Sequence, residues 1–259
     1  MKLDNSIKEN LKVLITGGAS GIGLKIAEAY HAHGAKVFIC GTNKVKLENC
    51  LSEHPAWSGM LCDVTDEKAV ETFVHSAVTV MGGLDVVVNN AGIAGPTARL
   101  EDCDVNEWRK TIDINLNGVF LVSKFSIPHL RQSRGSIIHI SSVAGRIGFA
   151  LRSPYCSSKF ALQGLTESMS KELGPDGIRV NSILPGFVES ERWTNTTKAR
   201  AKEKGITYEE MRAQLLAQSS LRSTVSEEEV AHMCLYLSSK MGRNISGQML
   251  SLCANVEYL

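Results

Sequence analysis

The sequence contains no apolar run that approaches the roughly 18 residues needed to cross a bilayer. Lysine and arginine nearly balance aspartate and glutamate, and the formal net charge is +1. This balance provides neither the basic surface of a nucleic-acid-binding protein nor an acidic interaction tail. Residues 1–12 are charged and lack the apolar stretch of a secretory signal. We therefore expect a cytoplasmic protein whose partners are neither nucleic acids nor membranes.

The seven cysteines do not have the pattern of a disulfide framework or of a metal site. Their number is odd, their spacing is scattered and no Cys-x-x-Cys pair occurs. Cysteines of this kind are typical of reduced thiols in the cytoplasm. We expect no bound metal.

Short runs rich in valine and isoleucine alternate with longer stretches of helical periodicity. Most of these runs are continuously apolar, as expected of parallel strands that helices cover on both faces. No linker-like segment or repeat divides the chain. The pattern predicts one domain, residues 1–259, built on a Rossmann-type doubly wound parallel sheet of about seven strands. The expected strands are 12–16, 36–40, 60–64, 85–90, 136–142, 179–184 and 248–253, and the expected helices are 21–33, 44–53, 66–81, 104–131, 154–173 and 226–239.

Two irregularities interrupt this alternation. The long helix 104–131 contains Gly118, where we expect a kink or a break. Between Gly186 and Ser226 there is no strand but one charged helical segment, 196–218, after a loop. An insertion of this size in a compact domain is often a lid over a site, and we expect a substrate lid at about 187–220.

A glycine-rich loop, residues 16–23, joins the first expected strand to the first expected helix. Its sequence is TGGASGIG. Glycines at such a turn allow positive φ angles and let a pyrophosphate approach the backbone, and the following helix offers free N–H groups to that anion. The spacing is G-x-x-x-G-x-G rather than G-x-G-x-x-G, but the strand before it and the amphipathic helix after it supply the required context. The loop predicts a dinucleotide cofactor.

Tyr155 and Lys159 form a second candidate group. Positions four apart share one face of a helix, so the phenol and the ammonium point in the same direction. A nearby cation favours the phenolate form of tyrosine. Such a pair is also common on ordinary helix surfaces, so its context decides. Ser142 ends the fifth expected strand, at the carboxyl edge where open α/β sheets bind ligands, and Asn115 lies in the preceding helix.

At this point the chain resembles the short-chain dehydrogenase/reductase family, in its common form of about 250 residues. The resemblance implies that Tyr155 is the general acid/base and that Ser142 holds the substrate oxygen. It implies that Lys159 binds the nicotinamide ribose and lowers the pKa of the tyrosine, and that Asn115 anchors a water through which protons leave. The matching elements occur in the family's order and are 16–23, Asp63, 89–92, Asn115, Ser142, 155–159 and 185–186.

The resemblance also implies a nicotinamide cofactor along the carboxyl ends of the strands. Its expected contacts are Gly17, Ser20, Gly21, Ile22, Gly23, Thr42, Asp63, Val64, Asn89, Ala91, Gly92, Tyr155, Lys159, Pro185, Gly186, Val188 and Ser190. NAD enzymes of the family resemble one another in an Asp at the end of the second strand, where this chain has Gly41. The carboxylate that would repel a 2′-phosphate is missing, and Thr42, Asn43 and Lys44 could bind that phosphate. We therefore expect NADP in preference to NAD.

The substrate is the least defined part of the expectation. Hydride transfer between a secondary alcohol and a ketone is the expected reaction, with a 3-oxoacyl compound or a hydroxy or keto acid as the substrate. Two arginines near the site would suit an anionic substrate, although both could instead be solvated or paired. The candidate substrate-facing residues are Ser142, Ala144, Arg152, Tyr155 and Arg192, with Arg146 nearby.

Other readings of the same motifs remain open. An epimerase or dehydratase on the same fold, or a nucleotide-binding sensor without turnover, would share the cofactor site. The apolar tail 256–259 and the resemblance to a family of mostly tetrameric enzymes predict a homotetramer.

Overall fold

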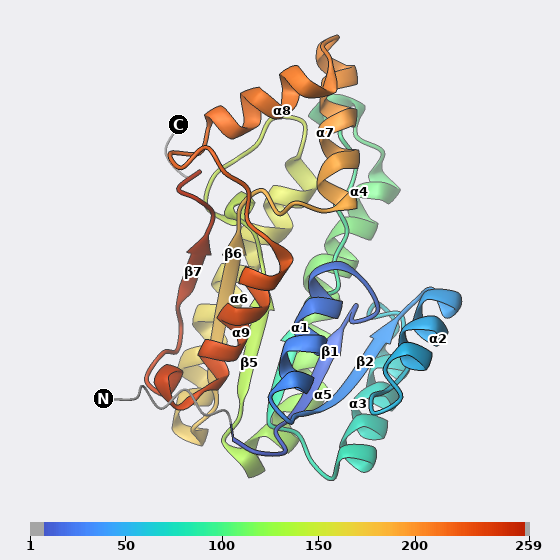
Figure 1. Cartoon of the computed structure of the whole chain (residues 1–259), viewed down its shortest axis with the longest axis vertical. Helices are drawn as coiled ribbons and strands as arrows, with labels where there is room; N and C mark the ends of the chain where they lie inside the picture. Colours follow the sequence, from blue (N-terminus) through green and yellow to red (C-terminus); the bar gives the residue numbers. More distant parts are fainter. Residues whose placement is uncertain (1–7, 257–259) are drawn as a thin grey trace.

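Seven parallel strands form one sheet in the part of the chain that the computed structural model describes, residues 8–256. The strand order is β3-β2-β1-β4-β5-β6-β7, and every neighbouring pair is parallel. Figure 1 shows β7 at one edge of this sheet. The predicted fold class is confirmed. The strands are β1 Lys12–Thr16, β2 Lys36–Gly41, β3 Ser58–Leu61, β4 Val86–Asn89, β5 Ser136–Ile140, β6 Arg179–Pro185 and β7 Met249–Leu252.

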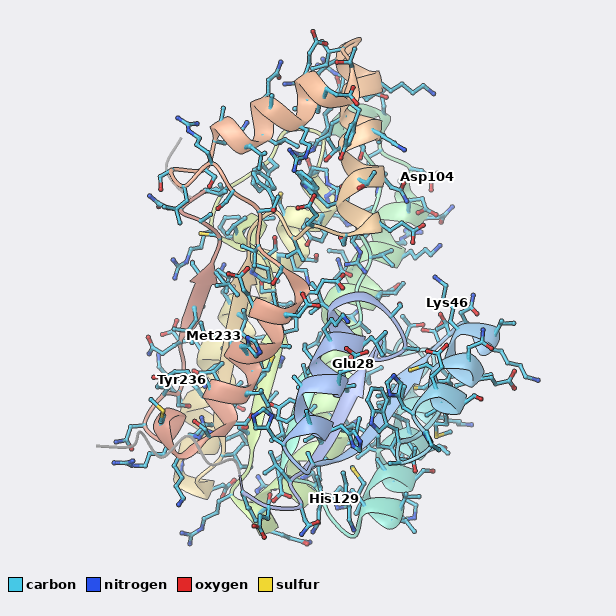
Figure 2. The ribbon with its side chains drawn as sticks, in the orientation of Figure 1. Glu28, Lys46, Asp104, His129, Met233 and Tyr236 are labelled. Atoms are coloured by element: carbon cyan, nitrogen blue, oxygen red, sulfur yellow. The ribbon has the colours of Figure 1, made fainter. Side chains whose placement is uncertain are left out.

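Helices cover both faces of the sheet, which explains why the strands are continuously apolar. Val13 and Ile15 of β1 pack into one core with α1, α2 and α9, whereas Leu14 between them packs into the opposite core with α3, α5 and α6. Figure 2 labels Glu28 on α1 and Met233 on α9, helices that lie side by side. The covering helices are α1 Gly21–Ala32, α2 Lys44–Glu53, α9 Glu227–Ser238, α3 Glu67–Met81, α5 Gly118–Ser133 and α6 Ser153–Leu173.

The strand order reverses direction between β1 and β4, the first strands of the two halves. In an open parallel sheet such a switch point leaves a crevice at the carboxyl ends of the strands, because the connections on its two sides run to opposite faces. The glycine loop after β1 and the segment after β4 border this crevice. The fold therefore places the two motifs at one edge.

The third strand lies earlier in the chain than predicted, at Ser58–Leu61 instead of 60–64. After Cys62 the backbone leaves the sheet because the Asp63 carboxylate accepts hydrogen bonds from the backbone N–H and the hydroxyl of Thr65, both at under 3 Å. Asp63 thus stands in a turn beyond the strand.

Of the two alternatives expected at Gly118, a kink or a break, the break does not occur, and the helix instead changes type just before this residue. The chain is helical from α4, Val105–Ile112, through a π-helical turn at Asp113–Asn117 and into α5. Gly118 has ordinary helical angles, and a Cβ built on it would lie 2.6 Å from the side chain of Val64. The glycine is required there by close packing.

The segment expected to form a lid, residues 187–220, contains two helices rather than the single predicted one. They are α7, Glu191–Lys204, and α8, Tyr208–Ala217, and they are separated at Gly205, which has a φ of +65°. Trp193, Met211 and Leu215 of the lid pack with Val256 in a small separate core. Val256 is thereby buried within its own chain, which does not fit the prediction that it meets a neighbouring subunit. The rest of the tail, 257–259, lies outside the described residues.

Among the helices of residues 8–256, none combines the length and the apolarity that crossing a bilayer requires.

Candidate active site

The glycine loop after β1 is shaped by two close approaches. Gly17 has a φ of +64°, and a Cβ built on Gly23 would lie 2.2 Å from the carbonyl oxygen of Gly17. The side-chain amide of Asn90, just after β4, donates to the carbonyls of Thr16 and Gly17 at 3.0 and 3.1 Å. Side chains larger than glycine would fill the space where the loop meets the start of α1.

The N-terminus of α1 has no side-chain cap. Ser20 stands at the N-cap but its hydroxyl makes no capping hydrogen bond, and the first turn holds no acidic residue. In contrast, Ser, Thr, Asn or Asp side chains cap α2, α3, α4, α7, α8 and α9. Helix N-terminal N–H groups that lack a cap attract an anion. The loop therefore fits the diphosphate of a dinucleotide.

Three residues with catalytic potential meet at the carboxyl edge of β5. Ser142 follows β5 and its Oγ accepts a hydrogen bond from the N–H of Ala144 at 3.1 Å, which leaves the hydroxyl proton free to donate. Tyr155 and Lys159 lie on one face of α6, with the Lys159 Nζ 5.8 Å from the centre of the Tyr155 ring. The sequence spacing thus corresponds to a real group of side chains.

Lys159 is almost fully buried, with an exposed fraction of 5%. Its Nζ donates to the carbonyl oxygen of Ile140 at 2.9 Å, and no carboxylate of the described residues pairs with it. Burial, and secondly the charge of Arg192, lower the pKa of Lys159 to about 7. The lysine can therefore lose or hold a proton near neutral pH.

Asn115 sits in the π-helical turn, and that turn positions its side chain. Its Oδ1 accepts from the N–H of Ile93 at 2.8 Å, and its Nδ2 donates to the Ile93 carbonyl at 3.0 Å and to Ser158 Oγ at 3.1 Å. Ser158 Oγ in turn donates to the carbonyl of Tyr155 at 2.7 Å. Asn115 thus connects the segment after β4 to the helix that carries Tyr155 and Lys159. π-Helical turns occur frequently at functional sites.

The side-chain amide of Asn89 is already engaged inside the domain. It is buried, and its Nδ2 contacts Ser123 Oγ at 3.2 Å and His139 Nδ1 at 3.1 Å. Burial, and secondly Lys159, lower the pKa of His139 to about 3, so that its ring is neutral. Asn89 can therefore reach a cofactor through its backbone only.

The other expected cofactor residues lie along the same edge. Asp63 is exposed beside the buried Val64. Thr42 is exposed at the end of β2, next to Asn43, whose side chain is occupied in capping α2. Ser20, Gly21 and Ile22 begin α1, and Ala91 and Gly92 follow β4. On the far side of the crevice lie Pro185, Gly186, Val188 and Ser190.

The three arginines expected near the substrate have different positions. Arg152 is buried beside Tyr155, with its guanidinium carbon 5.1 Å from the ring centre. Arg192, at the start of the lid, donates to the carbonyl of Gly92 at 2.9 Å and so crosses the crevice. Arg146 instead binds the carbonyl of Met249 in β7 at 2.7 Å, so it does not face the substrate region.

Four residues of the site were not found from the sequence, namely Asn90, Ser158, Arg200 and Glu227. Asn90 and Ser158 lie inside the motifs 89–92 and 155–159, and this position could have identified them as site residues. Arg200 stacks on Phe149 and Glu227 lies beside Gly21. Both come from segments distant along the chain, and only the fold brings them to these positions.

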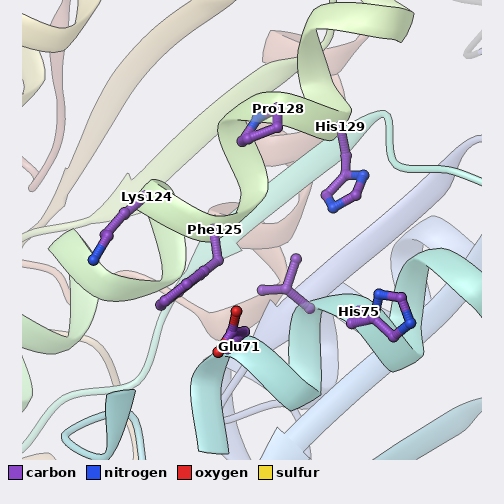
Figure 3. A pocket seen from close by; sticks show the side chains of 7 residues that line it. Glu71, His75, Lys124, Phe125, Pro128 and His129 are labelled. Atoms are coloured by element: carbon purple, nitrogen blue, oxygen red, sulfur yellow. The ribbon is translucent and has the colours of Figure 1, made fainter. Parts of the chain in front are cut away.

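A separate hollow lies between α3 and α5, where Glu71 and Phe125 border the same space (Figure 3). It is lined by Glu71, Val74, His75, Lys124, Phe125, Pro128 and His129. None of the expected catalytic or cofactor residues belongs to it.

Comparison with known proteins agrees with this geometry. The family described as short chain dehydrogenase matches residues 11–201. Trans-4-hydroxycyclohexanecarboxylate dehydrogenase of Sinomonas cyclohexanicum is 35% identical over 249 residues, which cover 92% of this chain and 90% of that protein. Two similar solved structures are known with a cofactor. Actinorhodin polyketide ketoreductase with NADPH has a TM-score of 0.91 and 30% identity, over 98% of this chain and 100% of that one. NAD⁺-bound xylitol dehydrogenase has a TM-score of 0.91 and 26% identity, over 95% of this chain and 99% of that one.

Sequence and overall fold are thus similar to those of known dehydrogenases and reductases. The chain belongs to the short-chain dehydrogenase/reductase family and is an NAD(P)-dependent oxidoreductase that interconverts alcohols and ketones.

Proposed function

We propose that Tyr155 is the general acid/base of this oxidoreductase, assisted by Ser142, Lys159 and Asn115. The observation that carries the proposal is the buried Lys159 cation beside the Tyr155 ring, with no carboxylate of the described residues to neutralise it. A positive charge in this position stabilises a phenolate. Asn115 is a positioning residue, since it acts on Tyr155 through Ser158.

The proton transfer follows from these positions. In oxidation, the Tyr155 phenolate oxygen accepts the proton of the substrate hydroxyl while the Ser142 hydroxyl donates a hydrogen bond to the same substrate oxygen. In reduction, Tyr155 returns the proton. A bound nicotinamide dinucleotide accepts or supplies the hydride.

The preferred cofactor in this proposal is NADP. β2 ends at Gly41 without a carboxylate, and Thr42 and Lys44 are exposed beside it. Lys44 lies 3.8 Å from Glu48 on the same helix, an exposed pair that a phosphate can displace. Parallel calorimetric titration with NADPH and NADH tests the preference. Equal affinities would contradict it.

The proposed substrate is a small secondary alcohol or ketone that carries an anionic group. The relative from Sinomonas cyclohexanicum is named for a hydroxy acid, and the actinorhodin enzyme is named for a polyketide. Hydroxy or keto acids and 3-oxoacyl compounds are the two classes considered. An epimerase or dehydratase activity, or a sensor without turnover, is not favoured.

The proposed assembly is a homotetramer in the cytoplasm. Phe120 on α5 and Phe160 on α6 are 50% and 46% exposed, and large exposed aromatic side chains are typical of interfaces. Within the described residues, no disulfide joins Cys40, Cys50, Cys62, Cys103, Cys156 and Cys234, which fits a reducing compartment. Sedimentation of the purified protein tests the assembly, and a monomer would contradict it.

Ser142→Ala tests the catalytic assignment. Loss of one oxyanion donor lowers kcat by about 10²- to 10³-fold, and the affinity for NADPH should remain within twofold. Ser157→Ala is the matched control, because Ser157 is exposed on the same helix as Tyr155. If Ser142→Ala kept the turnover of Ser157→Ala, the assignment would be wrong.

A further inference from the structure

Arg152 is a buried cation with unused hydrogen-bond donors beside the proposed acid/base. Its exposed fraction is 5%. Nη1 donates to Thr97 Oγ1 at 3.1 Å and Nη2 donates to the carbonyl of Ala94 at 2.6 Å. A guanidinium has five N–H donors, so the other three have no partner among the described residues. These contacts fix its plane and leave it able to bind a further group.

Arg200, on the lid helix α7, is a second arginine at the same place. It is half-buried, and its guanidinium carbon lies 5.3 Å from the centre of the Phe149 ring. Phe149 belongs to the loop before α6, three residues before Arg152. No hydrogen bond or ion pair links Arg200 to another of the described residues, so stacking on Phe149 alone orients it.

The two arginines meet at Phe149, because the backbone N–H of Arg152 donates to the carbonyl of Phe149 at 3.2 Å and the Arg200 guanidinium stacks on the ring of the same residue. Burial lowers the pKa of Arg200 to about 10, with the charge of Arg152 as the second cause. Burial is also the main cause that lowers the pKa of Arg152. No aspartate or glutamate within residues 8–256 forms an ion pair with either arginine. A buried and a half-buried positive charge without a counter-ion destabilise the free protein, and an anion bound between them would relieve this cost.

We propose that Arg152 and Arg200 together bind the carboxylate of the substrate, which makes the substrate a hydroxy or keto acid. This inference rests on the proposed function, because it places the carboxylate next to Tyr155. Arginine presents a planar pair of donors that matches a carboxylate in bidentate geometry. The guanidinium carbon of Arg152 lies only 5.1 Å from the Tyr155 ring centre, so the bound carboxylate must be near the reacting carbon.

This geometry separates the two substrate classes considered. In a short hydroxy acid the carboxylate is close to the hydroxyl-bearing carbon. In a 3-oxoacyl thioester the group beside the reacting carbon is neutral, and the charges of a carrier lie far away. Because Arg200 belongs to the lid and Arg152 to the body of the domain, a carboxylate between them also ties the lid to the body.

The first test is calorimetric titration of the NADP⁺-saturated enzyme with cyclohexanecarboxylate and with its neutral analogue cyclohexanecarboxamide. The carboxylate should bind at least tenfold more tightly, since a charge-assisted hydrogen bond contributes more than a neutral one. Arg200→Gln should lose about tenfold in carboxylate affinity and leave the amide unchanged. Arg200 makes no hydrogen bond to the described residues, so this substitution should not disturb folding.

Lys198→Gln is the matched control, because it removes a positive charge from an exposed position of the same helix. It should leave carboxylate affinity unchanged. Arg152→Lys keeps the charge but loses the planar fork, and it should weaken carboxylate binding while retaining NADPH affinity. Equal binding of acid and amide, no binding of either, or equal losses in Arg200→Gln and Lys198→Gln would overturn the proposal. Tighter binding of cyclohexyl phosphate than of the carboxylate would overturn the carboxylate assignment.

Turnover separates this inference from the proposed function. With trans-4-hydroxycyclohexanecarboxylate and its methyl ester as paired substrates, Arg200→Gln should raise KM for the acid and leave KM for the ester unchanged. Tyr155→Phe should abolish turnover of both and retain carboxylate binding. If Tyr155→Phe abolishes turnover of both substrates but Arg200→Gln changes KM equally for the acid and the ester, the carboxylate site is wrong and the proposed function stands. If Tyr155→Phe keeps its turnover, the proposed function fails.

Discussion

The Nζ atom of Lys159 lies 5.8 Å from the centre of the Tyr155 ring, in a position buried from solvent. The nearest polar partner of that ammonium is the carbonyl oxygen of Ile140, at 2.9 Å. A buried cation with one neutral partner is costly to the folded state. Such a loss of stability is typical of a residue whose charge has a role in catalysis.

Replacing this lysine should therefore stabilise the protein while it abolishes turnover. In Lys159→Met the buried charge is removed, and the free energy of unfolding at pH 6–7 should rise by about 2 kcal/mol, since each pKa unit corresponds to about 1.4 kcal/mol and relaxation recovers part of the cost. Urea denaturation of the cofactor-free protein measures the change. Lys171→Met, at an exposed position of the same helix, should give no such gain.

The effect depends on pH in a defined direction. The pKa of Lys159 is about 7 in the folded state and 10.5 ordinarily, so between these values the unfolded chain binds more protons. The free energy of unfolding of the wild type therefore rises from pH 7 towards pH 10. The amount by which Lys159→Met is more stable than the wild type should shrink over the same range. An advantage that stayed constant with pH would contradict the buried-cation account.

Glu227, the first residue of α9, should weaken cofactor binding. A Cβ built on Gly21 would lie 3.3 Å from the Glu227 Oε1, so this carboxylate borders the glycine loop. Burial, and secondly Glu228, raise its pKa. Removal of its charge in Glu227→Gln should tighten NADPH binding about fivefold at low salt, because repulsion of the diphosphate is lost.

Titration calorimetry at two salt concentrations checks this prediction. Glu228→Gln is the control, because the Oε1 of Glu228 lies 3.6 Å from the Nζ of Lys25, outside the glycine loop. Lowering the pH should tighten NADPH binding in the wild type more than in Glu227→Gln. Weaker binding in Glu227→Gln would mean that the carboxylate supports the cofactor.

Gly41→Asp should shift the cofactor preference towards NAD. Among residues 8–256, the only atom within 4 Å of a Cβ built on Gly41 is the Cβ of Ala19, at 4.0 Å, an ordinary contact. A carboxylate at the end of β2 can accept hydrogen bonds from a ribose diol and repels a 2′-phosphate. Affinity for NADPH should fall at least tenfold relative to NADH, as measured by parallel titration. An unchanged ratio would show that the end of β2 does not contact the adenosine ribose.

The sequence predicted most of the fold because its signals are local. Val13, Leu14 and Ile15 belong to a continuous apolar run, and both of their faces are indeed covered. The glycine loop and the pair Tyr155 and Lys159 were recognisable from their spacing together with the strands and helices expected around them. Each depends on one strand–helix turn or on one helical face.

Features that depend on contacts between distant segments were not predictable. The π-helical turn that holds Asn115 has no sequence signal, since it is fixed by hydrogen bonds to Ile93 and Ser158. Gly205 could have indicated that the segment 187–220 divides into two helices. The charged helical pattern continues through this glycine, however, and it led to the prediction of a single helix. Arg200 reaches the site only because α7 folds against the loop that contains Phe149.

The measurement that tests the central claim most directly is single-turnover hydride transfer in Tyr155→Phe, beside NADPH titration of the same protein. The phenylalanine ring keeps the shape of the site and removes only the hydroxyl. The account predicts that NADPH affinity stays within about threefold, equivalent to roughly 0.6 kcal/mol. It predicts that the rate of hydride transfer falls by at least 10²-fold, the contribution typical of a general acid/base. A variant that binds NADPH and transfers hydride at the wild-type rate would contradict the assignment of Tyr155.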